Sequence, residues 1–81
     1  GNTMKNELKM PKLRPEMERG VLCAWLKEPG EAYRKGEAIF EIETEKVVNQ
    51  VEAEQDGVMG RQLVEEGDEV AVGAPIAEVE D

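Results

Sequence analysis

Lys46 is the side chain of this sequence best placed for chemistry, because its primary amine lies in the polar run Glu43-Thr44-Glu45-Lys46-Val47. The stretches on either side, 38–43 and 47–54, alternate between apolar and polar residues, which is typical of strands with one buried face. Two strands joined by about three polar residues form a hairpin, so we expect the amine of Lys46 at or beside its tip, in solvent. The competing interpretation is an ordinary solvated surface lysine, like the others in the chain: Lys5, Lys9, Lys12, Lys27 and Lys35.

Most other kinds of site are excluded by what the sequence lacks. It has no histidine, which removes His-based triads, His general bases and His metal ligands. Cys23 is the single cysteine, so no internal disulfide or CxxC motif can form, and we expect it to be a small buried residue on a strand. The alternating glutamates have no glycine-centred loop of acidic ligands, so no metal site is predicted. A stand-alone enzyme would lack a base, a nucleophile and a chain long enough to form a pocket.

Length and charge narrow the class of protein further. The 81 residues correspond to one small domain, with a net charge of −9 from 10 basic and 19 acidic residues. That charge repels phosphate, so neither nucleic acid nor an anionic membrane is an expected partner. Residues 1–5 are expected to be a flexible N-terminal segment, with Gly1-Asn2-Thr3 left over from an expression vector, and residues 6–81 the folded domain.

An internal repeat relates the two halves of the chain, about 9–44 and 46–81. Glycines and isoleucines recur 37 residues later, with Gly30 matching Gly67, Gly36 matching Gly73 and Ile39 matching Ile76. Two copies are too few for a solenoid, so the repeat predicts two similar halves that pack face to face. Lys46 lies at the joint between the halves, and a two-fold relation would place both chain termini at the opposite pole.

The elements themselves are predicted to be short strands, because Gly and Pro interrupt every segment before a helical period is established. Besides the two strands that flank Lys46, strands are predicted at 20–27, 57–64 and 75–80, with a first strand or extended segment at 10–13. Ile39 breaks the alternation of its strand and is expected at a bulge or corner. The glycines at 30, 36, 67 and 73 are expected to form turns. Short strands at this spacing predict an all-β sandwich or flattened barrel.

Over most of its length, from Leu8 to Val79, the sequence closely resembles the lipoyl domains of 2-oxo acid dehydrogenase acyltransferases. The most specific match is Glu43-Thr44-Glu45-Lys46, with glycines at the family spacing. The resemblance implies a flattened β-barrel of two four-stranded antiparallel sheets with pseudo-two-fold symmetry. It also implies that Lys46, on an exposed hairpin, is the lysine that carries lipoic acid in amide linkage.

The function implied by this resemblance is that of a swinging-arm carrier and not of an enzyme. Lipoyl domains of this kind are modified by a lipoylating enzyme. They carry acyl groups and reducing equivalents between a thiamine-diphosphate-dependent 2-oxo acid decarboxylase, the acyltransferase core and dihydrolipoamide dehydrogenase. The isolated domain is expected to be a monomer, and the location implied is the bacterial cytoplasm or the mitochondrial matrix.

The residues around Lys46 bear on recognition. Glu45 and Val47 are expected to fix the hairpin for the lipoylating enzyme, with Thr44 and Glu43 as further flanking residues. Biotinyl carrier domains share this architecture but place the acceptor lysine between two methionines, so a biotinyl carrier is the alternative assignment. A β-sandwich adaptor that binds a partner without modification is a third.

Two features of this chain concern its partners. Arg14 and Arg19 stand where the family often has glycine and an acidic residue, in the loop near the modified lysine that helps to select the partner. Four glutamates are expected to form an acidic surface around the tip that steers basic partners: Glu41, Glu43, Glu45 and Glu52.

Overall fold

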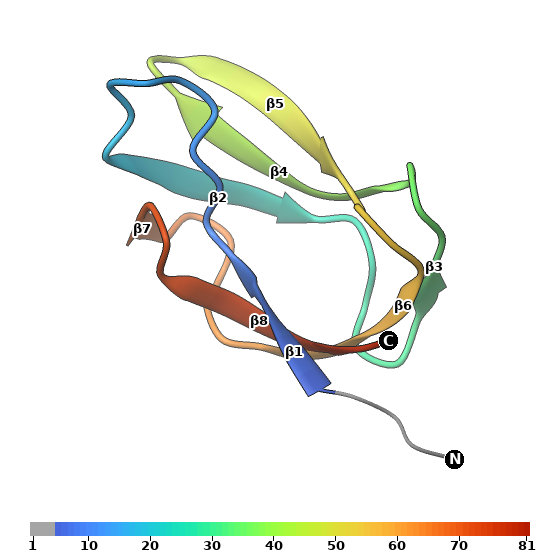
Figure 1. Ribbon diagram of the computed structural model, residues 1–81. Helices are drawn as coiled ribbons and strands as arrows, with labels where there is room; N and C mark the ends of the chain where they lie inside the picture. The colour runs from blue at the N-terminus through green and yellow to red at the C-terminus, as the bar shows by residue number, and fades with distance from the viewer. Residues whose placement is uncertain (1–4) are drawn as a thin grey trace.

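The structure is a computed structural model that describes residues 5–81, and within this range it consists of strands and connecting turns (Figure 1). The strands are β1 (Lys5–Lys9), β2 (Arg19–Trp25), β3 (Ala32–Tyr33), β4 (Ala38–Thr44), β5 (Val47–Glu52), β6 (Gly57–Gln62), β7 (Glu69–Ala71) and β8 (Pro75–Glu80). The all-β prediction is confirmed. Within residues 5–81 no helix is long and apolar enough to cross a membrane.

The N-terminal boundary differs from the prediction. Lys5 pairs with Glu80 in β1, so it belongs to the folded domain and the predicted flexible segment is wrong at that residue. The strand ends at Lys9, and the predicted first strand at 10–13 is a loop that leads into β2. The proposed vector-derived residues, Gly1 to Thr3, lie outside the described residues.

Two four-stranded antiparallel sheets form the body of the domain, in the orders β1-β8-β6-β3 and β5-β4-β2-β7. Each position in one sheet has a counterpart in the other, because β4, β2 and β7 match β8, β6 and β3. The fourth pair consists of β1, at the start of the first half of the chain, and β5, at the start of the second half. The predicted architecture of two related sheets is therefore confirmed.

Turn hydrogen bonds repeat with the 37-residue offset. The Leu26 amide donates to the Ile39 carbonyl over 2.9 Å, and the Leu63 amide donates to the Ile76 carbonyl over 2.8 Å. All four of the turn glycines identified in the sequence have positive φ, between 88° and 99°. Both halves therefore use the same turns to bring their strands together.

The core lies between the two sheets and is mostly aliphatic. Its largest fully buried side chains are Phe40, Met10, Leu22, Ile39, Ile42, Met59 and Ile76. Ile39 and Phe40 are both buried, because the pairing of β4 with β5 shifts register between Ala38 and Phe40, which confirms the bulge expected at Ile39. Trp25 packs edge-on against Phe40 with ring centroids 5.7 Å apart.

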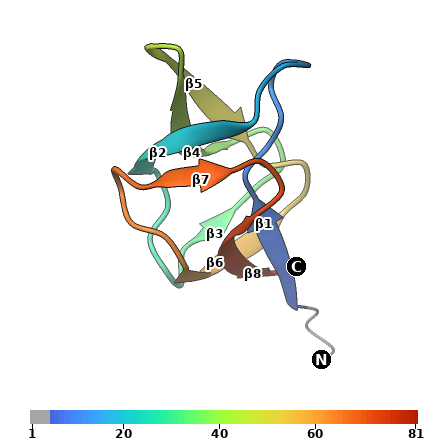
Figure 2. The ribbon, with the colours of Figure 1, turned by 90° about the vertical axis from the view of Figure 1, so that its left-hand side faces the viewer.

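The hairpin of β4 and β5 projects at one end of the molecule, together with the loop between β1 and β2 (Figure 2). The start of β1 and the C-terminus lie at the other end (Figures 1 and 2). The repeat predicts this separation, since it places the joint between the halves opposite the termini.

Candidate functional site

The turn between β4 and β5 consists of only two residues, Glu45 and Lys46. Thr44 pairs directly with Val47, so the loop is shorter than the predicted three polar residues. Both turn residues are left-handed, with φ of 49° for Glu45 and 65° for Lys46. Positive φ at both central positions is what a type I′ turn requires, and such turns match the right-handed twist of the flanking strands. Lys46 therefore lies at the tip of the hairpin, as predicted.

Nothing among residues 5–81 holds the Lys46 side chain. It is exposed, and within that range it takes part in no hydrogen bond or ion pair. Its neighbour Val47 is 55% exposed because the tip extends beyond the core. The amine is therefore open to approach by another protein.

The strand that leads into the turn is well anchored. Thr44 is only 8% exposed, and Ile42 two residues earlier is completely buried. Glu43 and Glu41 alternate with these residues and lie half-buried on the outer face of β4. Because the strand is fixed by its inner face, the turn has a defined position above a rigid base.

The four glutamates expected around the tip do not form one cluster. Glu52 pairs with Ala38 at the far end of the hairpin, so its predicted place beside Lys46 is wrong. Glu45 is held by Arg14, whose Nη1 lies 2.8 Å from Glu45 Oε2. Of these four glutamates, Glu41 and Glu43 lie on the outer face of β4, and the Nε2 of Gln50 donates to Glu41 over 3.1 Å.

Arg14 has a structural role in this site that its place in the sequence does not predict. Its Nη2 donates to Thr44 Oγ1 over 2.8 Å, in addition to the bond from Nη1 to Glu45. Arg14 lies 30 residues before Thr44 and 31 before Glu45, so no local sequence pattern indicates these contacts. The one available signal is Pro15, which favours a turn directly after Arg14.

A surface pocket of about 350 Å³ runs beside the hairpin, between the β1–β2 loop and the end of β4. Arg14, Glu45 and Lys46 lie on one part of its wall, and Arg19 and Glu69 on another. Arg19 Nη1 lies 3.0 Å from Glu69 Oε1, so the second arginine is paired away from the hairpin. The lysine tip and the loop therefore present one continuous surface.

Cys23 lies on β2, beside the glutamates of β4. Cys23 is half-buried, whereas the sequence predicts a buried residue. It occupies the point where the β2–β4 pairing shifts register. Desolvation raises the pKa of its thiol, and the carboxylates of Glu43 and Glu41 raise that pKa further. A thiol with a raised pKa is a poor nucleophile at neutral pH, so Cys23 has no evident chemical role here.

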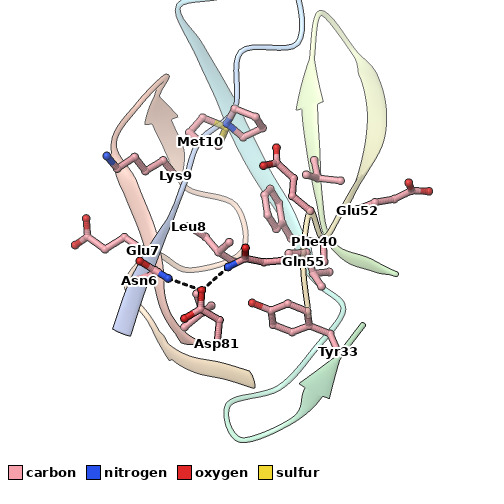
Figure 3. A pocket seen from close by; sticks show the side chains of 16 residues that line it. Asn6, Glu7, Leu8, Lys9, Met10, Tyr33, Phe40, Glu52, Gln55 and Asp81 are labelled. Atoms are coloured by element: carbon pink, nitrogen blue, oxygen red, sulfur yellow. Dashed lines mark hydrogen bonds between the residues drawn. The ribbon is translucent and has the colours of Figure 1, made fainter. Parts of the chain in front are cut away.

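A second surface pocket, of about 650 Å³, lies away from Lys46, between β1 and β5 (Figure 3). Tyr33 and Phe40 line its apolar part, while the amides of Asn6 and Gln55 both donate to the Asp81 carboxylate at its rim. Within residues 5–81 no group of three potential metal ligands occurs. The exposed lysine is therefore the feature of the described chain that best supports chemistry.

Comparisons with known proteins agree with this geometry. The family described as biotin-requiring enzyme (Biotin_lipoyl) matches residues 6–79. The chain is 45% identical over 73 residues to the dihydrolipoyllysine-residue succinyltransferase component of the 2-oxoglutarate dehydrogenase complex of Staphylococcus saprophyticus, covering 90% of this chain and 17% of that protein. It is 43% identical over 75 residues to the dihydrolipoyllysine-residue acetyltransferase component of the pyruvate dehydrogenase complex of Zymomonas mobilis, covering 91% and 17%.

One solved structure is similar over nearly its whole length. It is the lipoyl domain of the 2-oxoglutarate dehydrogenase complex from Azotobacter vinelandii, with a TM-score of 0.75 and 37% identity, covering 93% of this chain and 95% of that one. The chain thus matches an entire isolated domain but less than a fifth of each full-length relative.

Proposed function

Since this chain belongs to the Biotin_lipoyl family and is a lipoyl domain, we propose that Lys46 is its attachment site for lipoic acid. The resemblance drawn from the sequence is confirmed at the level of the family. Lipoyl domains are carrier modules of 2-oxo acid dehydrogenase acyltransferases, and their lipoate is held on a lysine.

The position of Lys46 carries the proposal. It is the second residue of a two-residue turn at the tip of a hairpin, in the motif Glu43-Thr44-Glu45-Lys46. The amine is exposed and unpaired within residues 5–81. A modifying enzyme must enclose the amine in its active site, and a partner must later enclose the arm, so an uncovered tip on a rigid strand pair fits both needs.

The chain's own contribution is placement. Attached lipoate supplies a disulfide that partner enzymes open, acylate and re-form. Lys46 provides the amide linkage, and the hairpin holds that linkage at the pole opposite the start of β1 and the C-terminus (Figure 2). A carrier tethered to its partners replaces a second diffusional encounter with an effective concentration that reaches about the millimolar range.

The alternative cofactor is biotin. Glu45 and Val47 flank the lysine here, where biotinyl domains have methionines. The similarity to an isolated lipoyl domain over 95% of its length also favours lipoate. An adaptor role without modification would not need the lysine, and it predicts that Lys46→Arg leaves function intact.

The wider setting follows as part of the same proposal. The module itself is non-catalytic and serves a lipoylating enzyme, a thiamine-diphosphate-dependent decarboxylase, an acyltransferase core and dihydrolipoamide dehydrogenase. Relatives come from bacteria and mitochondria, which favours the cytoplasm or the matrix.

The direct test is the intact mass of the domain after expression with lipoate and a lipoate–protein ligase. We expect one lipoyl adduct on the wild type and none on Lys46→Arg. Lys35→Arg is the matched control, because Lys35 is also an exposed lysine in a turn and its loss should not alter the adduct. Modification of Lys46→Arg, or a biotin adduct on the wild type, would contradict the assignment.

A second assay addresses the partners. The lipoylated domain is offered to decarboxylases that act on different 2-oxo acids, and reductive acylation is measured for each. We expect one partner to be strongly preferred, and acylation by none of them would contradict the carrier role.

A further inference from the structure

Arg14 is held in place by a tight turn of its own. The sequence Arg14-Pro15-Glu16-Met17 forms a β-turn in which the Met17 amide donates to the Arg14 carbonyl over 3.1 Å. Proline is favoured at the second position of such turns because its ring presets φ. The turn therefore holds the backbone of Arg14 independently of the contacts of its side chain.

Met17 fixes this turn to the body of the domain. Its side chain is only 6% exposed and packs in the core cluster, and its sulfur accepts a hydrogen bond from the Leu13 amide over 3.3 Å. A Cβ at Gly20 would lie 3.0 Å from the Met17 methyl and 3.5 Å from the Thr44 methyl, which shows how closely β2 lies against both side chains. The loop that carries Arg14 is therefore anchored beside the end of β4.

The Arg14 side chain spans from this anchor to the lysine-bearing turn. Its two terminal nitrogens donate to Thr44 Oγ1 and Glu45 Oε2, each over 2.8 Å. With 35% of its side chain exposed, Arg14 is partly desolvated, which strengthens charge-assisted hydrogen bonds. The two residues it holds are the two that directly precede Lys46.

The backbone of this turn is strained, so contacts from outside the hairpin are needed to stabilise it. Left-handed backbone is unfavourable for residues other than Gly, Asn and Asp, and here two consecutive residues, Glu45 and Lys46, adopt it. Strained turns persist when surrounding contacts over-determine them. Arg14 supplies two such contacts from outside the hairpin.

We propose that Arg14 is a positioning residue for Lys46, which stabilises the left-handed turn in the form that a lipoylating enzyme recognises. The proposal rests on the lipoate assignment of Lys46 but concerns a different residue and a different property. The hydrogen bonds of Arg14 go to Thr44 and Glu45 and not to the amine of Lys46, so its effect is on the population of the competent turn.

The first test needs no cofactor. In the unmodified domain, Arg14→Ala should speed amide hydrogen exchange at Val47, which pairs with Thr44 to close the turn, by about three- to tenfold, the effect of losing one or two hydrogen bonds of ordinary net strength. Arg19→Ala is the matched control, because Arg19 borders the same pocket and pairs with Glu69 but, within residues 5–81, makes no side-chain hydrogen bond or ion pair with the hairpin. Equal exchange in wild type and Arg14→Ala would overturn the proposal.

The second test uses the lipoylation reaction. If the competent turn is less populated, the KM for Arg14→Ala should rise about three- to tenfold with kcat unchanged, since apparent affinity falls with the competent fraction. Arg19→Ala removes the same charge near Lys46, so an equal rise in its KM would show that charge alone matters and would overturn the proposal.

Rescue separates positioning from direct recognition of Arg14 by the ligase. Asn tolerates left-handed backbone, so the double variant Arg14→Ala/Glu45→Asn should regain the KM of the single variant Glu45→Asn. A different result would refute the positioning role. If the KM of the double variant exceeds that of Glu45→Asn by the same factor by which the KM of Arg14→Ala exceeds that of the wild type, the ligase recognises Arg14 itself. Should the wild type not be lipoylated at all, the assignment of Lys46 fails, while hydrogen exchange still decides the role of Arg14.

Discussion

Thr44 lies directly opposite Val47 in the β4–β5 ladder, which leaves Glu45 and Lys46 as the whole of the turn. The pairing of β4 with β5 thus determines which residue occupies each turn position. Lys46 is the second turn residue and directly precedes Val47, the first residue of β5.

Exchanging the two turn residues tests this position. In the variant Glu45→Lys/Lys46→Glu the composition and net charge are unchanged, but the amine moves to the first turn position, where its direction differs. We expect enzymatic lipoylation, measured by intact mass, to fall to the level of Lys46→Arg. Normal modification of the exchanged variant would show that exposure of a lysine suffices and that its position does not matter.

The left-handed backbone of the turn predicts a stability cost. Lys46→Gly should raise the free energy of unfolding by about 1 kcal/mol, because glycine adopts positive φ without a Cβ clash. Lys46→Ala is the control, since alanine removes the same side chain but keeps the strain. Urea denaturation measures both, and an equal effect of the two substitutions would argue against strain at this position.

Gly60 on β6 predicts a cost of a different kind. A Cβ at this position would lie 2.6 Å from the backbone carbonyl oxygen of Glu78 on β8, so neither side can yield without moving a strand. We expect Gly60→Ala to destabilise the domain by about 2–3 kcal/mol. Cys23 occupies the equivalent place in the other half, and Cys23→Ala should cost much less by the same thermal or urea assay, since there the backbone already accommodates a Cβ.

The stability of the domain depends on pH through the carboxylate of Glu37. Its hydrogen bond from the Arg34 amide, and then that from Lys27 Nζ over 3.1 Å, lower the pKa of Glu37 below the value of 4.5 for a free group. The unfolded chain therefore takes up this proton first as the pH falls. The contribution of Glu37 is complete above pH 4.5 and is lost as the pH falls through the lower native pKa.

Comparison with Glu37→Gln isolates this effect. The difference in unfolding free energy between wild type and variant should be largest near neutral pH and should shrink as the pH falls below 4.5. Urea titrations at several pH values measure it. A difference that does not change with pH would contradict the assignment.

The outer face of β4 predicts a dependence on salt. With Glu45 paired to Arg14, the carboxylates of Glu41 and Glu43 remain near the tip to attract a basic partner. We expect the rate of reductive acylation of the lipoylated domain to fall with ionic strength, and less steeply in Glu41→Gln/Glu43→Gln. A rate that does not respond to salt in the wild type would show that these carboxylates serve only solubility.

Local signals in the sequence were sufficient for the glycine turns, the bulge at Ile39 and five of the eight strands, β2, β4, β5, β6 and β8. They misplaced the first strand and did not predict the short strands β3 and β7. Alternation of apolar and polar residues reports directly which face of a strand is buried, and a glycine at a turn reports positive φ. The 37-residue repeat also predicted the two-fold relation of the sheets, because similar sequences fold to similar halves. The same repeat placed Lys46 at the pole opposite the termini.

The sequence by itself therefore determined the fold class and the residue at the tip of the hairpin. Only the tertiary structure decided the two-residue turn, the distance of Glu52 from the tip and the two bonds from Arg14 to Thr44 and Glu45. Strand register depends on pairing across the sheet, and the reach of Arg14 depends on how Met17 anchors its loop. Such contacts join residues about 30 positions apart through packing, so no periodicity or local motif encodes them.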